Sequence, residues 1–334
     1  MVSAVIFVAT SCVSPLTGFA FWETNLAYEG ESIYNYLQVK NLSDRTILST
    51  NVLFGVQSVT MKDKGLTGMY YDTALAAPAL ADNANSALIL GMGTGTYARQ
   101  LKQYYPKMNI TGVEIDQKIT DLAGEYFDEP ADIPVTTYDG RAWLAASHDK
   151  YDVIMVDAYQ DITIPFQMSS TEFFTMVREH LNPGGVMVVN MNMISDGQGS
   201  INEALSDTIA SVFGNGNTLT ADVPNTTNRE LFAKKPGSGS EENSMQQASK
   251  ALNLRETTYE RTGSEDLEWY MEEVASRFRK VNEPDSASTI LTDDKAPVEV
   301  LGMHAIDQIS ADEAGPSRQI LKDEGFGGLL RAVQ

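Results

Sequence analysis

The stretch that decides the fold is Ser86-Ala-Leu-Ile-Leu-Gly-Met-Gly-Thr-Gly95, an apolar run that ends in three closely spaced glycines. Its apolar half predicts a buried strand over residues 86–90, and a helix is predicted over residues 97–104. Glycines between a strand and a helix let the backbone turn tightly and approach a ligand at the helix N-terminus. The loop therefore supplies the first candidate binding residues, Gly91, Gly93 and Gly95.

Apolar runs alternate with amphipathic segments further along the chain, which is typical of a parallel α/β sheet. Further strands are predicted at residues 109–115, 133–138, 152–156 and 185–190, with weaker strands at 218–223 and 229–234. Helices are predicted at residues 71–80, 117–127, 170–181 and 265–281. Short β-prone runs at residues 34–39 and 46–54 predict a small antiparallel region ahead of this sheet. The predicted fold class is α/β and Rossmann-like, with a small N-terminal β-region and a helical C-terminal extension.

The chain is predicted to have four parts: an uncharged apolar segment, the β-region, a Rossmann-like catalytic domain, and a linker with the helical extension, at residues 1–22, 23–80, 81–235 and 236–334. The first part has no charged side chain and nearly the length of a membrane span. We interpret it as a membrane anchor, or as the end of a last membrane helix in a longer protein. A buried first strand or helix is the alternative.

The composition limits the partners and the compartment. Forty-five acidic against 24 basic residues give a formal charge of −21, which argues against nucleic acid and favours cationic ligands, although solubility alone also explains it. The one cysteine, Cys12, excludes an internal disulfide and fits a reducing compartment such as the cytoplasm. The three histidines lack a metal-ligand spacing, so no metal site is predicted.

Acidic residues stand at the ends of the predicted strands. Glu114 ends the second strand, where an acid commonly accepts hydrogen bonds from ribose hydroxyls. The glycine loop itself leaves two interpretations open, because Gly93-Thr-Gly-Thr-Tyr-Ala98 fits an NAD fingerprint and Gly91-Met-Gly-Thr-Gly95 fits an S-adenosylmethionine site.

Three features further along the chain favour S-adenosylmethionine. Asp139 and Gly140 follow the third strand, where a carboxylate can accept a hydrogen bond from the adenine amino group. Asp157 closes the fourth strand, and Leu181-Asn-Pro-Gly-Gly185 leads into the fifth. These acids lie at the carboxyl ends of strands, where open α/β sheets bind their ligands.

The order of motifs resembles that of the spermidine synthase (polyamine aminopropyltransferase) family. The similar motifs are Glu31-Ser-Ile-Tyr-Asn-Tyr-Leu-Gln-Val39, Gln57, Tyr70-Tyr-Asp72, Leu88-Ile-Leu-Gly-Met-Gly93, Val113-Glu-Ile-Asp116, Tyr138-Asp-Gly140 and Asp152-Val-Ile-Met-Val-Asp157. Leu291-Thr-Asp-Asp-Lys-Ala-Pro-Val-Glu299 resembles a turn of the family's membrane-attached, synthase-like members.

The resemblance implies a transferase of polyamine biosynthesis that moves an aminopropyl group from decarboxylated S-adenosylmethionine to a diamine such as putrescine. The chain is also expected to form a homo-oligomer. The resemblance assigns Glu114 to the ribose and Asp139 to the adenine, and it makes Asp157 the catalytic carboxylate, assisted by Tyr70. The remaining implied donor residues are Asn35, Gln57, Gly91, Gly93, Gly95 and Gly140. The implied amine site consists of Tyr71, Asp72, Asp157 and Asp161.

The sequence departs from the family pattern at the amine site. Thr94 stands where the family's loop usually carries an acid, and the family's Tyr-His-Glu triplet is Tyr70-Tyr-Asp72 here. Asp157 and Asp161 are four residues apart rather than the family's three. Two alternatives therefore stay open: a methyltransferase that uses S-adenosylmethionine itself, and a non-catalytic domain that binds a nucleoside or a polyamine.

Overall fold

The computed structural model describes residues 23–51, 56–159, 164–192, 199–237, 244–286 and 288–303. The apolar segment 1–22, Asp161 and most of the predicted linker lie outside these ranges. Within the described ranges, no helix has both the length and the apolar character that a membrane span requires.

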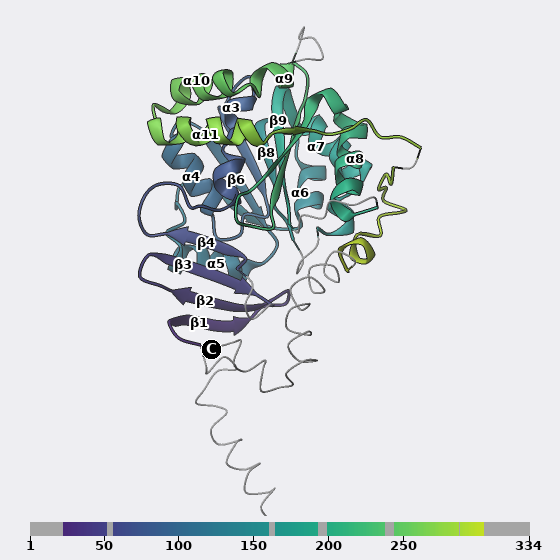
Figure 1. The fold of residues 1–334 in the computed structure, drawn as a ribbon. Helices are drawn as coiled ribbons and strands as arrows, with labels where there is room; N and C mark the ends of the chain where they lie inside the picture. The colour runs from purple at the N-terminus through teal and green to yellow at the C-terminus, as the bar shows by residue number, and fades with distance from the viewer. Residues whose placement is uncertain are drawn as a thin grey trace, which may run out of the picture.

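The described chain forms two sheets and the helices around them (Figure 1). The strands are β1 (Leu26–Glu31), β2 (Tyr36–Asn41), β3 (Arg45–Thr50), β4 (Ser58–Met61), β5 (Ser86–Leu90), β6 (Asn109–Glu114), β7 (Val135–Thr137), β8 (Tyr151–Val156), β9 (Leu181–Met191), β10 (Thr218–Asp222), β11 (Arg229–Lys234) and β12 (Arg279–Lys280). The helices are α2 (Tyr70–Ala74), α3 (Ala76–Leu80), α4 (Thr96–Tyr104), α5 (Gln117–Tyr126), α6 (Gly140–Ala146), α7 (Thr171–His180), α8 (Ile201–Phe213), α9 (Ser244–Ala248), α10 (Ala251–Thr262) and α11 (Glu265–Arg277), with short 3-10 turns at Phe166–Met168 and Asn215–Asn217.

The N-terminal sheet is antiparallel, with the strand order β1-β2-β3-β4. Leu37, Val39 and Leu48 are fully buried in it and pack against Leu122 and Phe127, at α5 and its C-terminal end. The predicted β-region is confirmed in β2 and β3, whereas β1 and β4 have no counterpart among the predicted runs. Packing on α5 fixes this sheet beside the carboxyl ends of the main strands.

The main sheet has the order β12-β10-β11-β9-β8-β5-β6-β7. The five strands from β9 to β7 are parallel, as the sequence predicts, and β11, β10 and β12 extend the sheet beyond β9 through antiparallel pairings. β6 lies on one side of β5 and β8 lies on the other, so the direction in which strands are added to the sheet reverses at β5. Such a switch point opens a crevice at the carboxyl ends of the strands.

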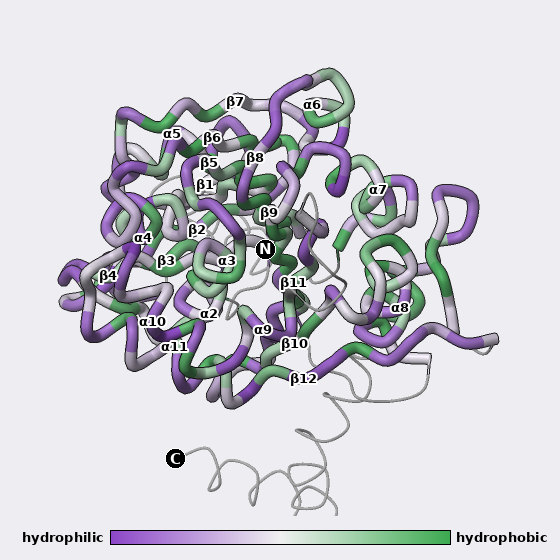
Figure 2. The backbone as a smooth tube through the Cα atoms, turned by 90° about the horizontal axis from the view of Figure 1, so that it is seen from above, coloured by the Kyte–Doolittle hydropathy of each residue, from purple (hydrophilic) through white to green (hydrophobic). Residues whose placement is uncertain are grey.

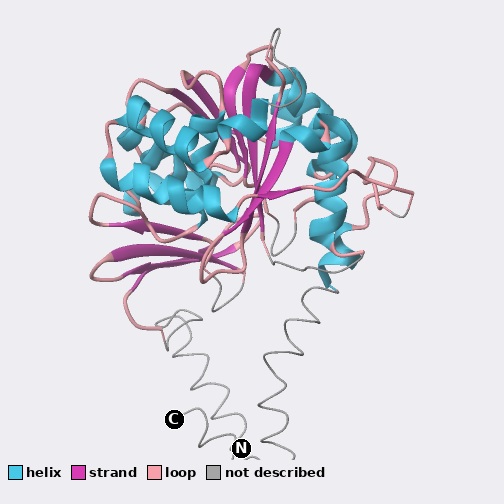
Figure 3. Ribbon diagram, turned by 45° about the horizontal axis from the view of Figure 1, so that its top comes forward, coloured by secondary structure: helices cyan, strands magenta, loops and turns pink. Residues whose placement is uncertain are grey.

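Helices cover both faces of the main sheet (Figures 1 and 3). Ala87 and Ile89 of β5 pack into the cluster with α3, α4, α10 and α11, and Leu88 and Leu90 pack into the cluster with α7 and α8. A strand that is buried on both faces needs an unbroken apolar run, which explains Ser86–Leu90. Seen from above, the hydrophobic strands lie inside and hydrophilic stretches of chain surround them (Figure 2).

The single helix predicted over residues 71–80 is two short helices, α2 and α3, which meet at Leu75. Proline has no N–H to bond the carbonyl four residues earlier, and its ring crowds that carbonyl. Pro78 therefore leaves the carbonyl of Ala74 without its helical partner, and that oxygen accepts a hydrogen bond from Tyr97 Oη at 3.1 Å.

The C-terminal helices belong to the main core. Leu267, Met271 and Val274 of α11, together with Leu254 of α10, are fully buried in the cluster around α3 and α4. β12 then adds an edge strand to the main sheet beside β10. The predicted helix at residues 265–281 therefore packs one face into the core, and it ends at Arg277 rather than at residue 281.

Candidate active site

A cavity of about 330 Å³ lies at the carboxyl ends of the parallel strands, between the two sheets. The glycine loop after β5, the ends of β6 and β8, helix α2 and the N-terminal sheet all contribute to its wall. Three acids, Glu114, Asp139 and Asp157, are among the described residues that line it, and no Lys, Arg or His is. The cavity therefore suits a cationic ligand.

The glycine loop touches the end of β8 through its backbone. Gly91 has a φ of +87°, and a Cβ atom placed on it would lie 2.4 Å from the carbonyl oxygen of Asp157. Only glycine fits both this backbone conformation and this approach. This close contact brings the glycine loop and the end of β8, which Asp157 follows, into one site.

Glu114 holds the glycine loop in place. Its carboxylate is buried and accepts hydrogen bonds from the N–H of Gly93 at 2.8 Å and the N–H of Asp116 at 3.0 Å. Burial raises the pKa of this carboxyl, and the two backbone donors oppose that rise. Glu114 therefore shapes the loop as well as offering oxygen atoms to a ligand.

Asp157 is the half-buried acid that directly follows β8. Its Oδ2 accepts a hydrogen bond from Tyr70 Oη at 2.6 Å, and its Oδ1 accepts one from Asn190 Nδ2 at 2.9 Å. Burial raises the pKa of Asp157 to about 7, the charge of Glu114 adds to the rise, and the two hydrogen bonds oppose it. A carboxyl with a pKa near 7 can act as a general base at neutral pH.

Two tyrosines of α2 stand beside this carboxylate. The rings of Tyr70 and Tyr71 are 4.0 Å apart, and Tyr71 Oη forms a hydrogen bond with Ser58 Oγ at 3.1 Å. Burial raises the pKa of both phenols, so each stays protonated at neutral pH. Ser58 in turn contacts the hydroxyl of Thr94 at 2.7 Å, which leaves a neutral group where the family pattern has an acid.

The structure gathers most of the sequence-predicted residues around the cavity. Those that line it are Asn35, Gln57, Tyr70, Tyr71, Gly91, Gly93, Glu114, Asp139, Gly140 and Asp157. Asn35 donates to Asp116 Oδ2 at 3.0 Å, and Asp139 caps α6 by accepting from the N–H of Ala142 at 2.7 Å. Gly95 is the N-cap of α4, with a φ of +77°.

Two of the predicted amine-site residues are not found in the cavity wall. Asp72 is fully buried, and its carboxylate accepts hydrogen bonds from the Thr67 hydroxyl, two loop N–H groups and Gln100. The carboxylate therefore closes the loop before α2 and does not reach the cavity lining. Asp161 lies outside the described residues.

Asn190 is a site residue that the sequence did not predict. It ends the predicted fifth strand beside Asp157, and Asn228 Nδ2 donates to its Oδ1 at 2.9 Å, which fixes the orientation of the amide. The sequence feature that could have identified Asn190 is its position at the carboxyl end of β9, the strand that pairs with β8.

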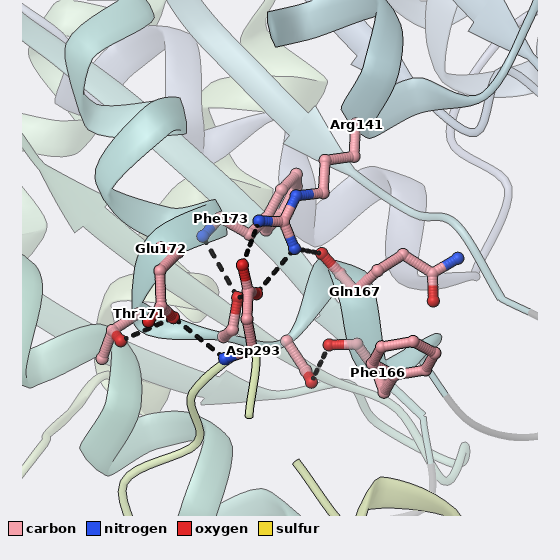
Figure 4. A network of polar contacts seen from close by, with 9 residues as sticks. Arg141, Phe166, Gln167, Thr171, Glu172, Phe173 and Asp293 are labelled. Atoms are coloured by element: carbon pink, nitrogen blue, oxygen red, sulfur yellow. Dashed lines mark hydrogen bonds and ion pairs between the residues drawn. The ribbon is translucent and has the colours of Figure 1, made fainter. Parts of the chain in front are cut away.

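The segment that resembles a family turn, residues 291–299, is tied to the wall of the cavity (Figure 4). Asp293 forms a two-pronged ion pair with Arg141, at 2.7 and 2.6 Å. Arg141 also donates to the carbonyl of Gln167, a residue that lines the cavity, at 2.7 Å. This network (Figure 4) fixes the turn beside the loop of Phe166–Met168.

Replacing Tyr70 by phenylalanine is expected to shift the pH dependence of the rate to higher pH. In the predicted role of Asp157 as the catalytic carboxylate, only its ionised form is active, so kcat/KM should rise with pH, with a midpoint near the pKa of about 7. The Tyr70 hydrogen bond lowers that pKa, and its loss raises the midpoint. Tyr71→Phe is the matched control, because its hydroxyl contacts Ser58. An unmoved midpoint in Tyr70→Phe would contradict the assigned contact.

Comparison with known proteins identifies the family. The spermine/spermidine synthase domain model matches residues 69–235. A probable polyamine aminopropyl transferase of Bifidobacterium longum is 99% identical over 334 residues, which is all of this chain and 75% of that protein. A polyamine aminopropyltransferase of Vibrio vulnificus is 28% identical over 209 residues, 60% of this chain and 69% of its own.

Solved structures support the fold. The crystal structure of a probable spermidine synthase from Corynebacterium glutamicum matches with a TM-score of 0.56 at 22% identity, over 80% of this chain and 99% of that one. A spermidine synthase in complex with the transition-state analogue AdoDATO matches with a TM-score of 0.53 at 18% identity, over 64% of this chain and 75% of that one. The family model and the near-identical relative together show that this chain is a transferase of the spermine/spermidine synthase family.

Proposed function

We propose that this chain transfers an aminopropyl group from decarboxylated S-adenosylmethionine to a diamine such as putrescine. The observation that carries the proposal is Asp157, a half-buried carboxyl with a pKa of about 7 that lines a cavity with two further acids. Tyr70 and Asn190 hold its two oxygens in a fixed direction. This is the arrangement that a proton acceptor for a cationic amine requires.

The charge of the cavity favours the decarboxylated donor. Decarboxylated S-adenosylmethionine carries a sulfonium and an ammonium group, whereas ordinary S-adenosylmethionine adds a carboxylate. The described lining offers three acids and no basic side chain to pair with that carboxylate. Burying an unpaired charge is costly, so the lining selects against the carboxylate.

The donor is proposed to lie along the ends of β5, β6 and β7. Glu114 would accept from the ribose hydroxyls and Asp139 from the adenine amino group, as carboxylates at these strand ends can. Gly91, Gly93 and Gly140 let the backbone come close, and Asn35 and Gln57 close the site from the N-terminal sheet. Gly95 contributes to the donor site as the N-cap residue of α4, the helix that follows the glycine loop.

The reaction follows from the charge states. An amine with a reference pKa of about 10 is protonated at neutral pH and cannot attack carbon. The Asp157 carboxylate would hold the ammonium and take one proton. The freed nitrogen lone pair then attacks the aminopropyl carbon next to the sulfonium. The carbon–sulfur bond breaks, its electron pair stays on sulfur, and neutral methylthioadenosine leaves. Alignment for in-line attack contributes much of the acceleration.

The acceptor is proposed to bind between Asp157 and the two tyrosines, with Asp161 as a further acid on the segment after β8. Asp72 takes no part in this proposal, because its carboxylate already accepts hydrogen bonds from the loop before α2 and from Gln100.

A methyltransferase is the second candidate function. The observation in its favour is Thr94, a neutral residue that weakens repulsion of a donor carboxylate.

Calorimetric titration with three ligands tests the donor assignment. Methylthioadenosine is expected to bind, S-adenosylhomocysteine to bind more weakly because of its carboxylate, and NAD not to bind. Tight NAD binding without binding of either thioether would rule out the assignment. Tighter binding of S-adenosylhomocysteine than of methylthioadenosine would favour the methyltransferase.

Two further expectations concern assembly. We propose a homo-oligomer, which light scattering of the purified chain tests.

We also propose membrane association through residues 1–22. Flotation with vesicles tests it by comparing the full chain with a variant that lacks this segment. Equal flotation of the two proteins would contradict the anchor.

A further inference from the structure

Glu230 of β11 is a fully buried carboxylate without a partner. Its exposed fraction is 0%, and neither of its oxygens has a hydrogen-bond partner among the described residues. Burial, together with the charge of Asp157, raises its pKa well above the ordinary value. Buried polar groups are nearly always hydrogen-bonded, so this exception needs an explanation.

The same strand shows how the fold treats another buried charge. Lys234 lies four residues further along β11 and is 2% exposed. Its Nζ donates to Asp82 Oδ1 and to the carbonyl of Leu80, each at 2.8 Å. The buried ammonium of Lys234 therefore has hydrogen-bond partners, whereas the buried carboxyl of Glu230 on the same strand has none among the described residues.

Strand pairing places Glu230 next to the catalytic carboxylate. In the antiparallel pair of β9 and β11, Glu230 stands directly opposite Asn190, whose side chain donates to Asp157. Residues directly opposite one another have Cβ atoms about 5 Å apart and point to the same face. The side-chain amide of Asn190 therefore lies between the carboxyl groups of Glu230 and Asp157.

Glu230 is not itself among the described residues that line the cavity, but it lies on the same face of the sheet as Asn190, whose side chain contacts the cavity residue Asp157. Phe232, two residues along β11, belongs to the buried cluster that contains Tyr70, Tyr71 and Tyr97. Tyr97 and Tyr159 line the cavity, and the charge of Glu230 contributes to the raised pKa of both. The carboxylate thus stands behind the tyrosines, on the Asp157 side of the cavity.

We propose that Glu230 binds the second, non-reacting ammonium group of the acceptor, and so makes the enzyme specific for a diamine over a monoamine. This inference rests on the proposed aminopropyl transfer. An ammonium carries three donors and can satisfy both open oxygens of Glu230 while the other nitrogen faces Asp157. Charge-assisted hydrogen bonds of this kind are about twice as strong as neutral ones.

Glu230→Gln tests the inference with two acceptors, putrescine and 1-aminobutane, which lacks the second amine. At saturating donor, the variant is expected to raise KM for putrescine about 10- to 100-fold, with kcat changed much less. The preference of the enzyme for putrescine over 1-aminobutane should fall by the same factor. Methylthioadenosine affinity should stay unchanged. An unchanged preference would overturn the inference and leave Glu230 as a buried, protonated structural acid.

Asp207→Asn is the matched control, because Asp207 is a buried carboxylate on α8, outside the pair of β9 and β11 that places Glu230 opposite Asn190. Glu230→Met is a second variant that keeps the volume if glutamine is not tolerated. If the wild-type chain turns over neither amine, the proposed function fails. Calorimetric binding of putrescine to the methylthioadenosine-saturated chain still tests Glu230: weaker binding in the variant supports the inference, and equal binding overturns it.

Discussion

Asp157→Asn is expected to lower turnover by about 10²- to 10⁴-fold, because an amide cannot accept the proton that the acceptor amine must lose. Asparagine keeps the shape of the side chain and can still face Tyr70 and Asn190. The backbone contact between Gly91 and residue 157 is also unchanged. Donor affinity, measured with methylthioadenosine, should therefore stay close to that of the wild type while kcat falls.

Asp152→Asn is the control from the same strand. Asp152 is buried, and its carboxylate accepts from the Asn85 N–H and from Asn182 at the opposite end of β8. We expect this variant to lose stability and to keep its turnover once folded. Near-normal turnover in Asp157→Asn would remove this residue from the mechanism and leave Tyr70 as the next candidate.

Glu114→Ala is expected to weaken methylthioadenosine binding by about 1–3 kcal/mol, which is roughly 5- to 150-fold. The variant loses the proposed ribose contact and also the acceptor for the N–H groups of Gly93 and Asp116. Calorimetry measures the loss directly. Glu125→Ala, an exposed acid on α5, controls for the change in net charge. Equal affinity in Glu114→Ala and wild type would contradict the donor site.

The sequence predicted the centre of the main sheet because the decisive signals there are local. β5, β6 and β8 are short apolar runs that each end at a glycine or an acid. Parallel strands share one carboxyl edge, so Glu114 and Asp157 had to meet once the strands were assigned. Gly91 lies with them in the lining of the cavity.

Features that depend on pairing across the chain escaped prediction. Asn190 and Glu230 come together only because β9 and β11 pair antiparallel, and nothing near either residue signals that register. Helix α8 was also missed, although Ile201, Leu205, Ile209 and Phe213 recur at helical spacing, so the signal for this helix was present in the sequence. Asp72 was assigned from its motif, whereas the loop before α2 decides where its carboxylate points.

Aminopropyl transfer is tested most directly by the mass of the products formed from decarboxylated S-adenosylmethionine and putrescine. We expect equal amounts of methylthioadenosine and aminopropylated putrescine, and no product when ordinary S-adenosylmethionine replaces the donor. A methylated acceptor formed from ordinary S-adenosylmethionine, or no product from either donor when both bind, would contradict it.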